Sequence, residues 1–67
     1  MSRKLSQEAY NKLKEELEQR ETEERRKIAN DIREAKEFGD LSENAAYKDA
    51  RDAEVQNESR IVYLKSI

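Results

Sequence analysis

Several residue types that usually stabilise small domains are missing from this sequence of 67 residues. There is no cysteine, which excludes disulfides and thiolate metal sites, and no histidine, which excludes an imidazole base or ligand. Proline is absent as well, and glycine occurs once, at Gly39. No apolar run approaches the roughly 18 residues of a membrane span. We therefore expect one small, cytoplasmic domain with no membrane partner.

Charged residues, in contrast, are abundant: they make up 45% of the chain, against 34% for apolar residues. That ratio fits either a disordered chain or a long solvated helix. The lack of helix-breaking residues and the predominance of Glu, Lys, Arg, Ala, Leu and Gln favour helix. The formal net charge is only −2, so no strong overall field draws the chain to nucleic acid or membranes.

The single glycine divides the chain into two helical segments, predicted at about 6–38 and about 43–66, with a tip at 39–42. Ser6 is a candidate cap for the first helix, and Gly39 fits the left-handed position that follows a helix. Asp40 with Glu43 reads as a capping box for the second helix, and Ser42 is a second candidate cap. Apolar residues recur at helical spacing in the first segment, at Tyr10, Leu13, Leu17, Ile28, Ile32, Ala35 and Phe38.

Such a short connection makes the helices antiparallel neighbours. Their apolar residues then pair about the turn, with Leu17 near Leu64. Residues 18–27 contain no apolar side chain, and the facing stretch around Asn57 is polar as well. Because these gaps match, we predict an all-α fold: a long antiparallel two-helix coiled-coil hairpin with an acidic tip. At about 1.5 Å per residue its first helix is about 50 Å long.

The open end of the hairpin carries four consecutive apolar residues, Ile61–Leu64. One face of a helix cannot bury all four, so part of this segment should be exposed. An exposed apolar surface indicates a neighbour, either a second domain or another copy of the chain. We accordingly expect weak self-association through Ile61–Leu64.

The tip is where chemistry is most plausible. Asp40 and Glu43 carry hard oxygen donors suited to Mg²⁺. Two protein ligands do not make a tight site, because the ion takes six oxygens and retains its waters. These carboxylates would therefore complete a site supplied mostly by a partner. Spacing alone favours the simpler interpretation, in which both residues only cap a helix.

The tip also resembles a known family. The run Gly39-Asp40-Leu41-Ser42-Glu43-Asn44-Ala45, followed by Tyr47, is similar to the tip of the N-terminal coiled-coil domain of the bacterial Gre transcript-cleavage factors, GreA type. The likeness covers essentially the whole chain without gaps. Two departures are Ala46, where the family often has another acid, and Arg26, which replaces a common proline. The family's C-terminal domain has no counterpart in these 67 residues, which we treat as a single domain, 1–67.

The resemblance implies a function. The hairpin would enter the secondary channel of bacterial RNA polymerase and stimulate cleavage of backtracked RNA near its 3′ end, so that stalled complexes resume transcription. The polymerase performs the reaction, so the chain itself is not an enzyme. Asp40 and Glu43 take the catalytic tip roles and help to hold a shared Mg²⁺. Asn44 either adds a polar contact or is an ordinary residue of the first turn.

Two basic residues, Lys36 and Arg51, match family positions that face the extruded RNA. A solvated helix face explains them equally well. Two other function classes stay open: a hairpin that occupies the polymerase channel as an inhibitor, and a structural coiled-coil module that pairs through Val62 and Tyr63. A cleavage factor requires the carboxylates of Asp40 and Glu43, whereas an inhibitor requires only the shape.

Overall fold

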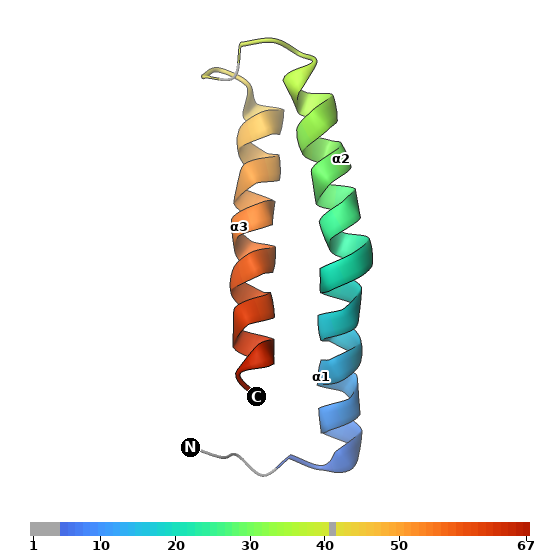
Figure 1. Cartoon of the computed structure of the whole chain (residues 1–67). Helices are drawn as coiled ribbons and strands as arrows, with labels where there is room; N and C mark the ends of the chain where they lie inside the picture. The colour runs from blue at the N-terminus through green and yellow to red at the C-terminus, as the bar shows by residue number, and fades with distance from the viewer. Residues whose placement is uncertain (1–4, 41) are drawn as a thin grey trace.

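The computed structural model describes residues 5–40 and 42–67; residues 1–4 and Leu41, which belongs to the predicted tip, lie outside the described residues. The described part is helical and contains no strand. Three elements, α1 (Gln7–Gln19), the π-helical turn η1 (Arg20–Glu24) and α2 (Arg25–Lys36), follow one another directly and form one long rod. The fourth, α3 (Ala45–Lys65), returns beside it (Figure 1). The predicted all-α antiparallel hairpin is confirmed.

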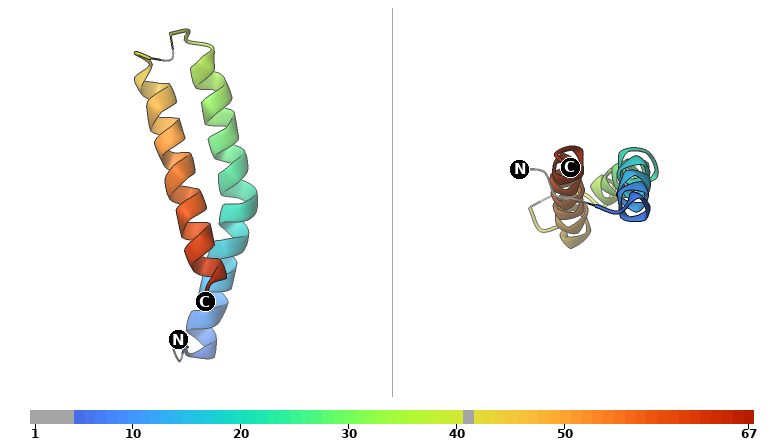
Figure 2. Two further views of the ribbon diagram at one scale, coloured as in Figure 1. Left: turned by 60° about the vertical axis from the view of Figure 1, so that its left-hand side comes forward. Right: turned by 90° about the horizontal axis from the view of Figure 1, so that it is seen from below.

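The hairpin is narrow, with extents of 48 × 21 × 12 Å, and its length agrees with the predicted 50 Å. The C-terminus lies at the end opposite the connection, and α1 extends past it (Figure 1). Figure 2 shows the two rods side by side and a change of direction in the first rod, between α1 and α2. Within the described part of the chain, no helix combines the length and the apolar character needed to cross a membrane.

The first rod begins as predicted and ends early. The Ser6 hydroxyl accepts a hydrogen bond from the Ala9 N–H at 3.1 Å, which confirms the cap. The rod ends at Lys36, not at residue 38, because the N–H groups of residues 37–39 bond to carbonyls three residues earlier, at 3.1–3.2 Å. This tighter geometry closes the last turn. Phe38 therefore leaves the apolar stripe, contrary to prediction, and is 75% exposed.

The second helix also differs from its predicted bounds. It begins at Ala45, two residues late, because Asn44 is its cap, and it ends at Lys65. The proposed caps Asp40 and Ser42 were wrong, and the connection runs over residues 37–44 instead of 39–42. Gly39 adopts the predicted positive φ, 105°. A Cβ there would meet nothing within 4 Å, so a side chain would be strained by the backbone alone.

The apolar core is small and divided into two parts. Near the tip, the first rod and α3 bury Ile28, Ala35 and Ala50, and near the open end α3 buries Ile61 and Leu64. A hollow at the open end is lined by residues that the predicted register brings together, namely Leu13, Leu17, Leu64 and Ile67. Between these parts the predicted polar gap is confirmed: Asn57 is buried there and bonds to Arg20.

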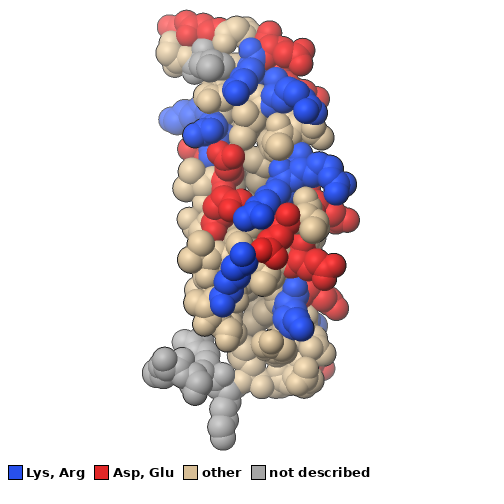
Figure 3. Space-filling model, in the orientation of Figure 1, with Lys and Arg blue, Asp and Glu red and all other residues tan. Residues whose placement is uncertain are grey.

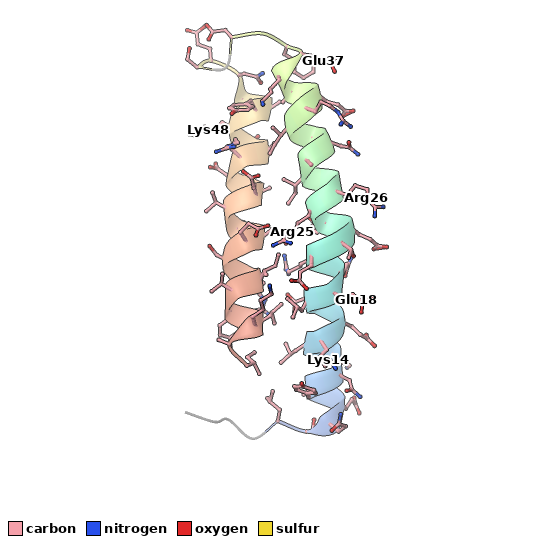
Figure 4. The ribbon with its side chains drawn as sticks, viewed as in Figure 1. Lys14, Glu18, Arg25, Arg26, Glu37 and Lys48 are labelled. Carbon is pink, nitrogen blue, oxygen red and sulfur yellow. The ribbon has the colours of Figure 1, made fainter. Side chains whose placement is uncertain are left out.

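Ion pairs cross the polar gap between the rods. Arg25 donates two hydrogen bonds of 2.8 Å to the carboxylate of Glu58 on α3. Figure 4 shows Arg25 reaching from the first rod toward α3, whereas its neighbour Arg26 points away. Lys65 lies 3.0 Å from Glu21. The middle of the rod is therefore held by charges and hydrogen bonds rather than by apolar contacts.

A third carboxylate in this region makes stability depend on pH. Hydrogen bonds from Arg60 and then Arg20 lower the pKa of Glu16 from 4.5 to about 2. Between pH 4.5 and pH 2 Glu16 is protonated in the unfolded chain and ionised in the folded chain. Its contribution to the free energy of unfolding is therefore complete above pH 4.5 and is lost as the pH falls toward 2. We expect Glu16 to contribute about 1–2 kcal/mol to this loss, reduced from the full shift because the side chain is 29% exposed.

Urea unfolding at a series of pH values, followed by circular dichroism, measures this contribution. Glu16→Gln should flatten the acid side of the stability profile, while the matched change Glu15→Gln, at the exposed neighbour, should leave its slope as in the parent. An unchanged slope in Glu16→Gln would show that this carboxylate is not responsible.

The apolar segment at the open end is partly exposed, as predicted. Ile61 and Leu64 are buried, whereas Val62 is 69% and Tyr63 50% exposed. We expect the protein to associate weakly through these two side chains, with a dissociation constant of about 1 mM, which corresponds to about −4 kcal/mol. Sedimentation equilibrium should show the average mass rising with concentration. Replacing Val62 and Tyr63 by Ser should abolish the rise, and replacing Val55, which is 61% exposed elsewhere on α3, should not.

Candidate functional site

The connection at the end of the rod presents two carboxylates to solvent. Asp40 and Glu43 are both exposed, in the segment between α2 and α3. Figure 3 shows acidic side chains at this end of the molecule and a group of Lys and Arg side chains beneath them. The sequence prediction that the tip is acidic is therefore correct in position.

Asp40 is held in a fixed orientation by the next described residue. Its Oδ1 accepts hydrogen bonds from the Ser42 hydroxyl at 2.8 Å and from the Ser42 N–H at 3.0 Å. These bonds, the hydroxyl first, hold the pKa of Asp40 below its usual range. The carboxylate is thus ionised at neutral pH and has little freedom to rotate. The predicted capping box with Glu43 does not form, because α3 begins at Ala45 with Asn44 as its cap, and Asp40 Oδ1 bonds to Ser42 instead.

Asn44 links the tip to both helices. Its Oδ1 accepts a hydrogen bond from the Tyr47 N–H at 3.0 Å and so caps α3. Its Nδ2 donates to the main-chain carbonyl of Ala35, on α2, at 2.6 Å. One side chain therefore starts the second helix and ties it to the end of the first. Sequence reasoning underrated this residue, although Asn directly before two alanines is a strong N-cap signal.

The two basic residues predicted to contact RNA lie on one face of the hairpin. Lys36 follows the buried Ala35 and Arg51 follows the buried Ala50, each by one residue. Because successive helical side chains are about 100° apart and the helices are antiparallel, both project to the same side. Arg51 also pairs with Glu54 at 3.3 Å while its side chain remains 54% exposed. This positive face lies directly beside the acidic tip.

A shallow, open hollow on this face extends from Glu43 in the connection to Arg51 on α3. It is lined by residues of the connection and of the first two turns of α3, among them Glu43, Tyr47, Lys48 and Arg51. Ser42, which holds Asp40, lines the same hollow. Of the predicted site residues, Glu43 and Arg51 line this hollow, whereas Asp40 and Lys36 do not. Tyr47 is half-buried, and Lys48 points outward from α3 (Figure 4).

The donor set decides which metal chemistry the tip can support. Among the described residues there is no group of three or more acidic, His or Cys side chains placed to hold a metal ion. Asp40 and Glu43 offer carboxylate oxygens, the donors that Mg²⁺ prefers, but the ion requires six oxygens in near-octahedral geometry. The two residues therefore fit a Mg²⁺ site only as a part of it, with the remaining ligands supplied by water or another molecule.

Comparisons with known proteins show the family of this chain. The family described as transcription elongation factor, N-terminal, of GreA and GreB, matches residues 3–67. The protein called transcription elongation factor GreA from Clostridioides difficile is 46% identical over 63 residues, which are 94% of this chain and 40% of that protein. The GreA of Chloroherpeton thalassium gives the same figures.

A third relative, the GreA of Beijerinckia indica, is 48% identical over 61 residues, which are 91% of this chain and 39% of that protein. The chain therefore spans about 40% of the length of the curated relatives that it matches. No solved structure gives a significant match.

Proposed function

Because this chain belongs to the N-terminal domain family of the GreA and GreB transcription elongation factors, we propose that it acts on bacterial RNA polymerase during elongation. The hairpin enters the secondary channel of the polymerase with its tip leading. There it stimulates cleavage of the 3′ end of backtracked RNA, and the stalled complex resumes synthesis. The observation that carries the proposal is an exposed, ionised and oriented Asp40 at the end of a narrow rod.

The shape of the molecule supports this function. A rod of 48 × 21 × 12 Å can extend a small tip into a deep passage. The described hollows are shallow grooves of the surface, and the tip holds too few ligands for a catalytic metal site of its own. We therefore propose that the polymerase performs the reaction, and that this chain supplies groups to it and is not an enzyme by itself.

The tip residues have distinct parts in this proposal. Asp40 and Glu43 would hold a Mg²⁺ ion jointly with the polymerase, and the ion would supply positive charge that stabilises the oxygens of the phosphodiester during cleavage. The two carboxylates would also orient the attacking water by accepting its hydrogen bonds. Ser42 keeps the Asp40 carboxylate aimed. Asn44 fixes the position of the connection relative to the ends of α2 and α3.

The direct test uses elongation complexes of bacterial RNA polymerase that are stalled in the backtracked state, with RNA labelled at its 3′ end. Addition of the 67-residue protein should speed release of the labelled 3′ fragment. The protein is added over a range of concentrations until the effect saturates. If the protein binds to saturation and cleavage does not increase, the proposal fails, and blocked nucleotide addition would then identify an inhibitor.

The basic face should contact the phosphates of the extruded RNA. Replacing Lys36 and Arg51 together by Ala should raise the concentration that half-saturates cleavage, and the log–log dependence of that value on salt should become shallower by about 1 to 2, one for each lost phosphate contact. Arg26→Ala is the matched control, since Arg26 lies in mid-rod and points away from α3 (Figure 4). Equal salt slopes for the double variant and the parent would leave these residues as a solvated face only.

A further inference from the structure

The middle of the hairpin contains a buried polar side chain that no tip function requires. Asn57 is only 3% exposed, in a rod that buries few residues of any kind. Its side chain forms two hydrogen bonds with a single residue of the first rod, Arg20. Its Oδ1 accepts a hydrogen bond from Arg20 Nη1 at 3.0 Å, and its Nδ2 donates to the Arg20 main-chain carbonyl at 3.1 Å. Asn57 is therefore bonded to both the side chain and the backbone of Arg20.

Arg20 is also connected, through Glu16, to a second residue of α3. Arg20 Nε donates to Glu16 at 2.8 Å, and Glu16 accepts two more bonds from Arg60, at 2.8 and 3.0 Å. Asn57 and Arg60 are three residues apart on α3, and Glu16 and Arg20 are four apart on the first rod, so each pair lies on one helical face. One hydrogen bond within the first rod, from Arg20 to Glu16, and two sets of bonds between the helices connect four side chains, which we call the polar layer: Glu16, Arg20, Asn57 and Arg60.

The local form of the backbone fits this contact. The first rod changes to π-helical geometry at Arg20, over Arg20–Glu24, where Figure 2 shows the change of direction. The wider π turn disturbs the regular ladder of helical hydrogen bonds, and Asn57 supplies a partner to a carbonyl of that turn. Thr22 adds to the disturbance, because its hydroxyl donates to the Glu18 carbonyl at 2.8 Å.

The apolar core of the hairpin is small and is divided into two parts on either side of the polar layer, so apolar contacts alone hold the alignment only weakly. A different alignment would arise if α3 slid by one helical turn, about 5.4 Å. Asn57 would then lose both bonds to Arg20 and remain buried without partners, and Glu16 would lose Arg60. A buried amide that is satisfied in one alignment only is a known means of specifying register in helical pairs.

We propose that Asn57, acting through Arg20, is a positioning residue that sets the register of the two helices and hence the place of the tip carboxylates relative to the rest of the rod. The register itself is a property of the free protein. Its effect on cleavage rests on the function proposed above. The tip has one clamp close by, from Asn44 to Ala35, and the polar layer is the second, about midway along the rod.

The test compares distances and stability in the free protein. The chain has no cysteine, so spin labels can be attached to Ala29→Cys and Gln56→Cys, two exposed positions on opposite helices. The parent should give one narrow distance. Asn57→Leu should lower the melting temperature, because the Arg20 carbonyl and guanidinium lose their partner, and it should broaden or split the distance by about 5 Å, one helical turn.

Two further variants make the result decisive. Arg20→Met leaves Asn57 in place and removes the guanidinium, and it should broaden the distance as well. Ser59→Leu adds the same side chain at an exposed position of α3 outside the polar layer, and it should keep the narrow distance. If Asn57→Leu and Arg20→Met both keep the parent's single distance, the register is set elsewhere and the proposal is overturned.

A cleavage measurement separates positioning from a merely structural role. At saturating concentration Asn57→Leu should cleave about tenfold more slowly, because the carboxylates are misplaced in part of the population, while its half-saturating concentration stays within about twofold of the parent's. A parent protein that does not stimulate cleavage would contradict the proposed function and leave the distance result standing. If the parent stimulates cleavage and Asn57→Leu stimulates it equally well, only the positioning role is contradicted.

Discussion

Asp40→Asn is expected to lower the rate of stimulated RNA cleavage by about 10²-fold or more, the scale associated with loss of a positioned catalytic group. The reason lies in the hydrogen bonds of the tip. An amide oxygen can accept the bonds from the Ser42 N–H and hydroxyl as the carboxylate does, so the turn should persist. What disappears is the negative charge, and with it the attraction for a metal ion held by the polymerase.

The measurement is cleavage of backtracked complexes at saturating protein, with binding followed separately. Binding of Asp40→Asn should stay close to that of the parent. Glu37→Gln is the matched control, because Glu37 is an exposed acid at the same end of the rod (Figure 4) and outside the connection's hydrogen bonds with Ser42. It should cleave as the parent does. Should Asp40→Asn also cleave at the parent's rate, the catalytic assignment of this residue is wrong.

Asn44→Ala is expected to have the largest effect on stability, a loss of about 2 kcal/mol. Removal of an N-cap costs about 1 kcal/mol, and loss of the part-buried hydrogen bond to Ala35 costs about 1 kcal/mol more. For a domain of this size the melting temperature should fall by about 10 °C. The start of α3 should fray as well, which disorders the adjoining Glu43.

Two variants of the same residue separate its two bonds. Asn44→Ser retains a cap for α3 and has no group that reaches Ala35, so it should lose about half as much stability. Asn44→Asp also caps, but it places a carboxylate against a carbonyl and should be less stable than the Ser variant. Thermal unfolding followed by circular dichroism ranks them. A serine variant as unstable as the alanine variant would mean that the cap contributes little.

Local signals predicted the start of the first helix better than its end or the start of the second. Ser6 stands alone as a cap, so the sequence left little choice there. Asp40, Ser42 and Asn44 are all capable N-caps within five residues, and the side-chain preferences of the three are similar. The structure selects Asn44, which alone among the three also reaches Ala35. Tertiary contact decided what propensity could not.

Interactions between the helices were the least predictable. Spacing along one helix identifies partners four residues apart, but Arg25 pairs with Glu58 and Lys65 with Glu21, across the hairpin. Those partners depend on how each helix is rotated about its axis. The π turn at Arg20–Glu24 has no composition of its own that distinguishes it from the surrounding helix. It becomes intelligible only once Asn57 is seen on the opposite rod.

For the candidate site, sequence reasoning placed Asp40 and Glu43 at the tip but could not orient them. The capping interpretation assigned the carboxylate of Asp40 to a helix, whereas its Oδ1 accepts two hydrogen bonds from Ser42. The aromatic Phe38 was assigned to the core because its spacing continued the stripe, and the early end of α2 put it in solvent. Both errors come from the two extra residues on each side of the predicted tip.

The division of the hairpin into apolar ends and a charged middle has a mechanical consequence. Salt weakens the attraction within exposed ion pairs, and the pairs that cross the middle, Arg25 with Glu58 and Lys65 with Glu21, are partly exposed. Apolar contacts at the ends are not weakened in this way. The hairpin should therefore bend most easily at its centre, and more easily as salt is added, while the two apolar ends stay packed.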